Sequence, residues 1–204
     1  HPPVAVEMKP SQRKIYDYIE KQYISDIAGG RDQRLKSELV KARLIRLMQA
    51  ATNPALLRQP ISDFAAIEGV DFSNIKDDSD MLREILKYSE NEIPAKYEKA
   101  RDIIKGIIDD GGKVIVWACY IKNIEMLSKY LESQGIETRT LYGATPIAGD
   151  DLTEEDEEYS LTREAIVKEF HDPDSSFKAI IANPFAVSES ISLHKACHNA
   201  IYLE

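Results

Sequence analysis

The sequence predicts an α/β protein, with a mainly parallel sheet flanked by helices and an N-terminal helical appendage. From residue 94 onward, short apolar and β-branched segments alternate with segments of helical periodicity, which is typical of successive β-α-β units. Glycines follow the expected helices at Gly111-Gly112 and Gly135, where helices commonly stop. After an extended entry segment at 1–8, apolar residues recur at helical spacing from residue 10 to residue 51, which separates the appendage from the sheet.

Length and composition are those of an ordinary globular chain. With 204 residues, the sequence can form one full α/β domain and a smaller appendage, or one large domain. Hydrophobic residues make up 43% and charged residues 30%, and no apolar run approaches the roughly 20 residues that cross a bilayer. We therefore expect no membrane partner and a cytoplasmic setting, or a nuclear one in a eukaryote. Cys119 and Cys197 are expected to be reduced thiols in the core.

The net charge of −9 restricts how this chain can meet nucleic acid. An acidic surface does not capture DNA by broad attraction, so any DNA contact must be local. Much of the excess lies in residues 150–158, of which seven are Asp or Glu. Their mutual repulsion favours an extended, solvated excursion from the sheet.

Caps and breakers bound the expected N-terminal helices. Ser11 is a suitable N-cap for the first helix, and Gly29-Gly30 ends it. Asn53-Pro54 interrupts the second helix, although Ala55–Leu57 can form one more turn. Residues 59–91 are rich in Pro, Asp, Ser, Asn and Gly, which predicts a loop-rich connection with one short helix.

Four strands are expected in the sheet, each a short apolar run followed by polar residues. After the strand ending at Ala182, a polar loop is expected at Asn183-Pro184, and residues 188–194 suit a short helix. Open parallel sheets bind ligands at the carboxyl ends of their strands, so this loop is the first candidate site. The expected elements are helices at 10–27, 32–51, 81–89, 96–110, 121–134 and 161–171 and strands at 113–119, 137–142, 177–182 and 200–203.

Residues 188–193, Ser-Glu-Ser-Ile-Ser-Leu, carry the first resemblance to a known family. They resemble motif V in the second RecA-like lobe of the Swi/Snf-related ATPases of helicase superfamily two, which usually reads Gly-(Glu or Leu)-Gly-Ile-(Ser or Asn)-Leu. Ser188 and Ser190 stand where the family usually has glycine. Serine is strained at positive φ, where glycine is not. Tyr202-Leu203-Glu204 is similar to the family's next strand, which ends in an acidic residue.

Other segments show the same resemblance in the family's order. Thr140–Thr145 is similar to the signature Arg-x-(Asp or His)-Gly-(Ser or Ala)-(Thr or Met) at a strand end. Arg163, Ile166 and Phe170 match the Arg-x-x-Ile-x-x-Phe helix that follows it. The remaining similar segments are 113–120, like the motif IV strand, and 11–16 and 44–57, like parts of the helices between the two motor lobes.

The resemblance implies a domain organisation and a function. Residues 1–91 would be a helical inter-lobe region with a loop-rich connection, and residues 92–204 a second RecA-like lobe that ends before motif VI. The chain would be part of an ATP-dependent DNA translocase. Its partners would be the double-stranded DNA backbone and the first RecA-like lobe of the same parent protein. ATP and Mg²⁺ would be cofactors of that full-length parent only.

The resemblance also assigns site residues. Glycine permits close approach of a ligand, and amides and hydroxyls can bind phosphate without adding charge. The alternatives are a strand-terminating turn in which Thr145 is an N-cap and a merely solvated Lys122. The expected DNA contacts are Gly143, Ala144, Thr145, Asn183 and Lys122, and the expected contacts near the nucleotide are Glu189 and Ser190.

No catalytic residue and no metal site are expected in this chain. A P-loop needs Gly-x-x-x-x-Gly-Lys-(Ser or Thr), and no Gly-Lys-(Ser or Thr) occurs here, so the isolated chain is expected to be inactive. His194 and His198 flank Cys197, but a fourth zinc ligand is missing. The alternative hypothesis is a non-catalytic α/β protein-interaction module that shares only the architecture.

Overall fold

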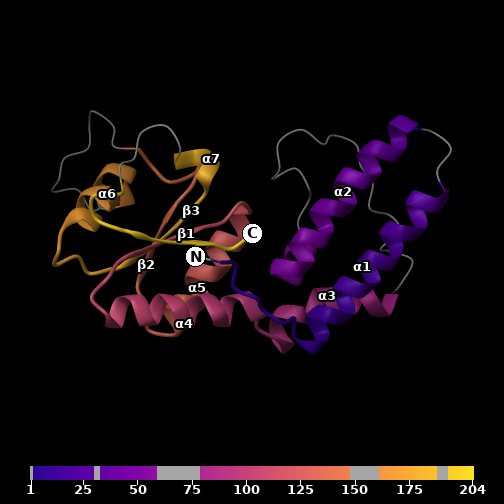
Figure 1. The fold of residues 1–204 in the computed structure, drawn as a ribbon, viewed down its shortest axis with the longest axis horizontal. Helices are drawn as coiled ribbons and strands as arrows, with labels where there is room; N and C mark the ends of the chain where they lie inside the picture. Colours follow the sequence, from indigo (N-terminus) through magenta and orange to yellow (C-terminus); the bar gives the residue numbers. More distant parts are fainter. Residues whose placement is uncertain (1, 30–32, 59–78, 148–160, 188–192) are drawn as a thin grey trace. The chain divides into compact units, whose positions relative to one another are not determined.

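The computed structural model describes residues 2–29, 33–58, 79–147, 161–187 and 193–204 (Figure 1). The acidic run at 150–158 and residues 188–192 of the motif V-like turn lie outside these ranges. The described chain divides into two compact units, His1–Glu98 and Lys99–Glu204. The domain limits expected near residue 91 stay a prediction.

The first unit is helical. Its elements are α1 (Pro10–Gly29), α2 (Gln33–Thr52), the 3-10 helix η1 (Pro54–Arg58), α3 (Ser79–Asn91) and the start of α4 (Ala95–Asp109). They confirm the N-terminal helices and the extra turn predicted from the sequence. Ile15, Ile19, Leu56 and Ile85 are buried in its core.

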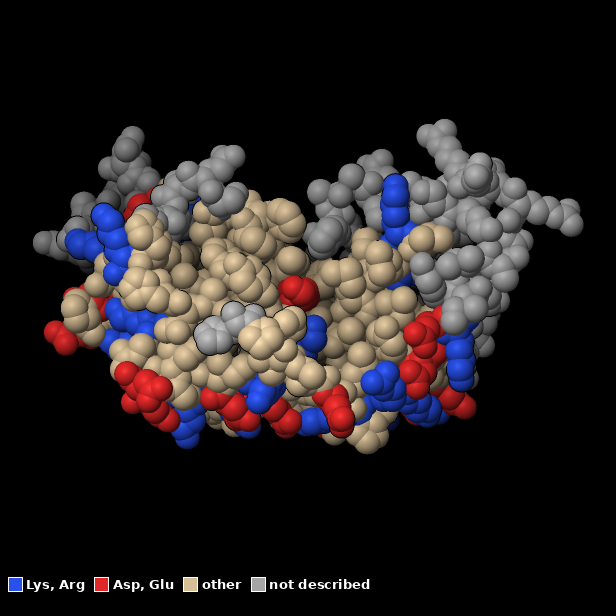
Figure 2. Space-filling model, in the orientation of Figure 1, with Lys and Arg blue, Asp and Glu red and all other residues tan. Residues whose placement is uncertain are grey.

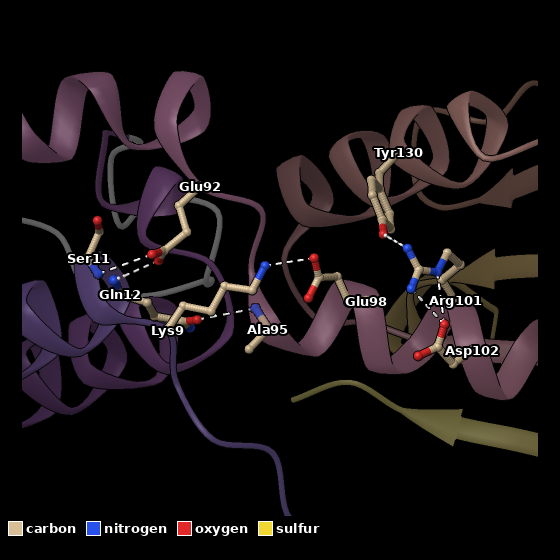
Figure 3. A network of polar contacts seen from close by, with 9 residues as sticks. All are labelled: Lys9, Ser11, Gln12, Glu92, Ala95, Glu98, Arg101, Asp102 and Tyr130. Carbon is tan, nitrogen blue, oxygen red and sulfur yellow. Dashed lines mark hydrogen bonds and ion pairs between the residues drawn. The ribbon is translucent and has the colours of Figure 1, made fainter.

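The buried side chain of Gln12 connects helix ends in this unit (Figure 3). Its Nε2 donates to the carbonyls of Ala50 (3.0 Å) and Ala51 (3.1 Å) near the end of α2. Its Oε1 accepts from the amide of Ala95 (3.3 Å) at the start of α4. Helix termini leave such backbone groups without partners in the helix, so Gln12 satisfies three of them.

Two carboxylates complete the network in Figure 3 within the first unit. The Glu92 carboxylate accepts from the amides of Ser11 (3.1 Å) and Gln12 (2.9 Å) in the first turn of α1. Glu98 pairs with the ammonium of Lys9 at 2.7 Å. A negative charge at a helix N-terminus is stabilising, so Glu92 takes the role of a cap for α1.

The second unit is built on a four-stranded sheet in which every neighbouring pair is parallel. The strands are β1 (Val114–Trp117), β2 (Thr138–Leu141), β3 (Ala179–Ala182) and β4 (Asn199–Tyr202), in the order β2-β3-β1-β4. The helices are the rest of α4, α5 (Ile121–Ser133), α6 (Arg163–His171) and the short α7 (Pro184–Val187). This architecture confirms the predicted RecA-like α/β fold, and the first unit confirms its helical appendage.

Helices cover both faces of the sheet, with α6 and α7 on one side and α4 and α5 on the other (Figure 1). On the α5 side, the hydroxyls of Ser128 and Thr138 are hydrogen-bonded at 2.7 Å. The partly buried Trp117 packs against the hydrophobic cluster on the α6 side. That cluster includes Ile115, Leu141, Ile166, Phe170, Phe177 and Ile180.

The predicted glycine stops are confirmed. Gly111 and Gly135 follow α4 and α5 with φ of 79° and 77°, in the left-handed region that glycine adopts without strain. The Gly112 amide donates to the carbonyl of Ile107 at 2.8 Å, and the Ile136 amide to that of Leu131 at 2.9 Å. Each bond closes its helix in the manner of a Schellman motif.

Three local predictions are wrong. Ser11 is not the N-cap of α1, because this helix already begins at Pro10. Asn183-Pro184 does not begin a loop but starts α7. The Asn183 Oδ1 accepts from the amide of Phe185 at 2.9 Å, as an N-cap does, and proline suits the first helical position. His194 lies in a turn before β4 rather than on a helix.

Candidate functional site

The carboxyl ends of β2, β3 and β1 are neighbours at one edge of the sheet, because the strand order is β2-β3-β1. The predicted DNA contacts follow these ends. Gly143, Ala144 and Thr145 follow β2, Asn183 follows β3, and Lys122 lies in the first turn of α5 after β1. We call residues 118–122, 142–146 and 183–187 the strand-end edge. It is the edge at which parallel sheets bind ligands.

The Thr145 side chain holds the turn after β2 together. Its hydroxyl accepts from the amide of Tyr142 (3.0 Å) and donates to the carbonyl of Thr140 (3.2 Å). The Thr145 amide also donates to the carbonyl of Tyr142 at 2.9 Å. The residue is buried, and its hydroxyl is already used within the turn. Replacing it should therefore cost stability, while its contact with DNA stays a prediction.

Gly143 and Ala144 form the exposed tip of this turn. Among the described residues, none accepts a hydrogen bond from either amide. The φ of Gly143 is outside the left-handed region, and a Cβ built on it would meet no atom within 4 Å. The folded chain itself does not require glycine at this position. The turn thus presents two backbone donors at an exposed tip whose only side chain is the methyl group of Ala144.

Asn183 connects the ends of three neighbouring strands. Its Nδ2 donates to the carbonyl of Cys119 after β1 at 2.8 Å, and its backbone amide donates to the carbonyl of Leu141 in β2 at 2.8 Å. With its Oδ1 capping α7, the side chain is buried and fully engaged in the fold. Its predicted contact with DNA stays a prediction, and its replacement should also cost stability.

Arg163 also belongs to this edge, a role that its match to the Arg-x-x-Ile-x-x-Phe helix does not indicate. As the first residue of α6, it directs its guanidinium at the turn after β2 and at α7. It donates to the carbonyls of Tyr142 (3.0 Å), Thr145 (3.3 Å) and Ala186 (3.3 Å), with a longer contact to Gly143 (3.5 Å). The available signal was an arginine directly after an N-cap, close in sequence to a strand-end turn.

Lys122 lies at the β1 side of the edge. Its Nζ pairs with the Glu125 carboxylate one turn further along α5, at 2.8 Å. Both side chains are partly exposed, and such pairs contribute at most about 1 kcal/mol. The lysine can therefore exchange its partner for a phosphate at little cost, and its predicted contact with DNA stays a prediction.

Glu204 makes the two sides of the edge electrostatically different. Its carboxylate accepts from the amide of Cys119 at 2.7 Å and from the Nδ2 of Asn123 at 2.6 Å, beside the ends of β1 and β4. Burial, and then the Glu204 carboxylate, raise the pKa of the Cys119 thiol. A negative charge here disfavours a phosphate next to β4. The Arg163 side of the edge is therefore the more favourable place for an anion.

The surface carries no broad positive patch in the view of Figure 2. Basic and acidic residues are mixed along α4, whereas the surface over the sheet is mostly uncharged in this view. On this face, a contact with phosphate would therefore depend on individual donors, in agreement with the net charge of −9.

The segment around Cys197 shows no metal-binding geometry. The Cys197 thiol is buried within hydrogen-bonding distance of the carbonyls of Lys113 (3.0 Å) and Asn199 (3.1 Å). Burial raises the pKa of this thiol as well. In the part of the chain that the structure describes, no three His, Cys, Asp or Glu residues form a group that could hold a metal ion. Glu189 and Ser190, the predicted nucleotide contacts, lie outside the described residues.

Comparison with known proteins gives matches in structure only. No family model and no curated protein matches the sequence. The structure is similar to the Sulfolobus solfataricus SWI2/SNF2 ATPase C-terminal domain, with a TM-score of 0.61 and 18% identity over 98% of this chain and 70% of that chain. It is also similar to the C-terminal part of the Fun30 ATPase domain, with a TM-score of 0.58 and 16% identity over 98% of this chain and 73% of that chain.

A third similar structure is the Sulfolobus solfataricus SWI2/SNF2 ATPase core in complex with dsDNA. The TM-score is 0.53 and the identity 17%, over 87% of this chain and 29% of that chain. At these identities the similarity establishes the fold. Within the described residues, no helix combines the length and the apolar character needed to cross a membrane.

Proposed function

The chain has the fold of the C-terminal domain of Swi2/Snf2 ATPases, and from that premise we propose that it is the second lobe of an ATP-dependent motor that moves along duplex DNA. In this proposal the strand-end edge contacts the DNA backbone. The lobe also completes an ATP site together with a first RecA-like lobe of the parent protein.

The proposal that the strand-end edge contacts DNA depends mainly on Gly143. The fold accommodates a Cβ at this position, so neither backbone conformation nor packing explains the glycine. Close approach by a ligand does explain it, because a glycine lets a phosphate reach the backbone amides. The amides of Gly143 and Ala144 are the donors that such a phosphate would use. Phosphate contacts of this kind position a protein on DNA without reading sequence.

The nucleotide part of the proposal depends on Glu189 and Ser190, by resemblance to motif V. Within the described residues, no three His, Cys, Asp or Glu side chains form a group that could hold Mg²⁺. The sequence lacks a P-loop, and the chain alone is proposed to hydrolyse no ATP.

The experiment is a titration of the ¹⁵N-labelled chain with a short DNA duplex at low salt, followed by amide NMR. We expect the largest shifts at Gly143 and Ala144 and smaller ones at the end of β3. Gly143→Ala should weaken binding severalfold because its methyl group occupies the approach to the amides. The folded chain should keep its stability or gain about 0.4–1 kcal/mol, since glycine is the more flexible residue when unfolded.

Gly106→Ala is the matched control. Gly106 lies within α4, and a Cβ there also meets no atom within 4 Å, so the same chemical change falls away from the edge. It should leave the titration unchanged. If DNA shifts no amide of the strand-end edge, the assignment of this edge to DNA is wrong. It is also wrong if Gly143→Ala binds like wild type and so does Gly143→Asp, which places a negative charge next to the proposed phosphate. The non-catalytic interaction module then becomes the better reading of the fold.

A further inference from the structure

We infer that Arg163 is the positioning residue of the strand-end edge. Its guanidinium orients the amides of Gly143 and Ala144 toward a DNA phosphate. This inference rests on the proposed function, because the phosphate is the ligand of that site. Arg163 itself does not touch the phosphate in this arrangement. It acts through the peptide groups of the turn.

The guanidinium donates hydrogen bonds to carbonyls of the turn. Its Nη2 donates to the carbonyl of Tyr142 at 3.0 Å and lies 3.5 Å from that of Gly143, and its Nε donates to the carbonyl of Thr145 at 3.3 Å. Hydrogen bonds from a charged donor are stronger than neutral ones. The planar fork of arginine can hold several acceptors in fixed directions, which the single ammonium of lysine cannot.

Because the peptide group is planar, the hydrogen bonds to these carbonyls also fix the directions of the adjoining N–H groups. In a trans peptide, the carbonyl of one residue and the amide of the next point in opposite directions. When the carbonyls of Tyr142 and Gly143 face Arg163, the amides of Gly143 and Ala144 face away from it. Both donors are therefore directed to the side of the turn opposite the guanidinium. The nearby cation also polarises these peptide groups and strengthens the amides as donors.

The same side chain fixes the turn to the neighbouring element. Its Nη1 donates to the carbonyl of Ala186 in α7 at 3.3 Å, and the Arg163 amide donates to the carbonyl of Pro146 at 2.9 Å. Arg163 thus connects the segment after β2 with the segment after β3. Both segments belong to the proposed DNA surface, so their relative position depends on this contact.

Arg163 has a charge that is not neutralised by the described residues. None of their carboxylates lies within ion-pairing distance of it, whereas Arg83 and Arg139 are both paired with acids. Within the described residues, this partly buried arginine contacts only carbonyls, and its positive charge lies next to the turn. This charge favours an anion at the β2 side of the edge.

The test repeats the DNA titration with Arg163→Lys and Arg163→Gln. Arg163→Lys keeps the charge and loses the fork, while Arg163→Gln loses both. We expect both variants to weaken binding about tenfold, because two amide hydrogen bonds are misaligned. We also expect both to reduce the DNA-induced shifts of Gly143 and Ala144. Arg83→Lys and Arg83→Gln, at an exposed arginine of the first unit, are the matched controls and should bind like wild type.

Two readouts separate positioning from direct contact. A direct ion pair with phosphate would lower the slope of log affinity against log salt by about one in Arg163→Gln, and Arg163→Lys would restore it. Positioning leaves that slope unchanged in both variants. Full rescue of binding by lysine, or wild-type binding by both variants, would overturn the inference.

Residual dipolar couplings of the free protein give a test that needs no DNA. The Gly143 and Ala144 N–H vectors should reorient in both Arg163 variants, while those of β3 stay in place. If DNA shifts no amide of the wild type but these vectors reorient in the variants, the proposed function fails and the role of Arg163 in orienting the turn stands. If DNA shifts wild type and the vectors do not reorient, the positioning role fails alone. If both variants unfold, the NMR signals of the two Arg163 Nη groups in the wild type decide instead. Separate signals would support a guanidinium held in place by the carbonyls, and averaged signals would contradict it.

Discussion

Gln12 satisfies three backbone groups that helix ends leave without partners: two carbonyls at the end of α2 and the amide of Ala95. An amide side chain supplies both donors and an acceptor, whereas a carboxylate supplies only acceptors and an apolar side chain neither. The residue is fully buried, so water cannot replace the lost bonds. Gln12 is therefore a structural centre of the first unit.

We predict that Gln12→Leu destabilises the first unit by roughly 2–4 kcal/mol, since each buried group left unpaired costs about 1–3 kcal/mol. Urea unfolding followed by far-UV circular dichroism measures this loss. Trp117, the single tryptophan, lies in the second unit, so its fluorescence should report an unchanged transition there. Arg13→Leu, at the exposed neighbouring residue, is the control. A loss below about 0.5 kcal/mol for Gln12→Leu would show that the network is not needed.

Thr145 gives a prediction for the second unit. Thr145→Val keeps the shape but leaves the amide of Tyr142 and the carbonyl of Thr140 without the hydroxyl, so we expect a loss of about 1–2 kcal/mol. Thr145→Ser keeps the hydroxyl and should be less costly. Trp117 fluorescence in urea measures both, and hydrogen exchange at Tyr142 should accelerate only in the valine variant. Equal stability of the valine variant and wild type would mean that the turn does not depend on this hydroxyl.

Cys119 provides a test of charge at the β1 side of the edge. Burial, with a second contribution from Glu204, raises the pKa of its thiol, so Cys119 holds its proton to higher pH in the folded chain. The unfolded thiol ionises near pH 8.5, so the free energy of unfolding should fall as pH rises above that value. Glu204→Gln removes the second contribution and lowers the Cys119 pKa.

Iodoacetamide labelling at pH 8 to 9 measures this effect, because the thiolate is the reactive form. Cys119 should be labelled faster in Glu204→Gln than in wild type. The buried Cys197 is an internal control, since the charge next to its thiol comes from Lys113 and not from Glu204. Equal labelling of Cys119 in both proteins would remove Glu204 as a cause of the shift.

Helices and strands could be predicted from the sequence where the apolar periodicity agrees with the residues that end an element. The helices of both units and all four strands were predicted because apolar spacing is set by the same burial that forms the core. The glycine stops were predicted because positive φ selects glycine at Gly111 and Gly135. Helix α7 was missed because four residues are too few to show a helical period, and Asn183-Pro184 suits a turn as well as a cap.

The candidate site was predictable only in part, for a related reason. A motif places Gly143, Thr145 and Asn183 at strand ends, but it does not show how each side chain is used. In the structure, Thr145 and Asn183 satisfy backbone groups of their own unit. Arg163 reaches the same edge from a position 18 residues beyond Thr145, a long-range contact that local periodicity does not contain.

For the whole molecule, the absence of a P-loop sequence leads to a prediction about catalysis. Without the lysine and hydroxyl that hold the nucleotide phosphates and the metal, the isolated chain should release no phosphate from ATP above background. A steady-state ATPase assay with and without duplex DNA measures this. Phosphate release that disappears in Glu189→Gln would contradict the prediction and place a complete active site within these 204 residues.

The charge of the whole chain limits how strongly it can bind DNA. The net charge is −9, and the face in Figure 2 carries mixed charges along α4 rather than the broad positive field that drives most non-specific binding. Contact would then come from a few backbone amides and one partly exposed lysine, each bond being worth roughly 1 kcal/mol. We expect a dissociation constant on the order of 10⁻⁴ M or weaker, with a shallow dependence on salt.

Fluorescence anisotropy with two labelled duplexes of unrelated sequence tests this prediction across a range of salt concentrations. The two duplexes should bind equally, because phosphate contacts carry no sequence information. The slope of log affinity against log salt should correspond to only one or two displaced counterions, since Lys122 is the only predicted contact with a formal charge. Lys122→Met should lower that slope, while Lys87→Met on α3 of the first unit should not. A steep slope that survives Lys122→Met would mean that DNA is held by a basic surface elsewhere, and a preference for one duplex would mean that base edges are read.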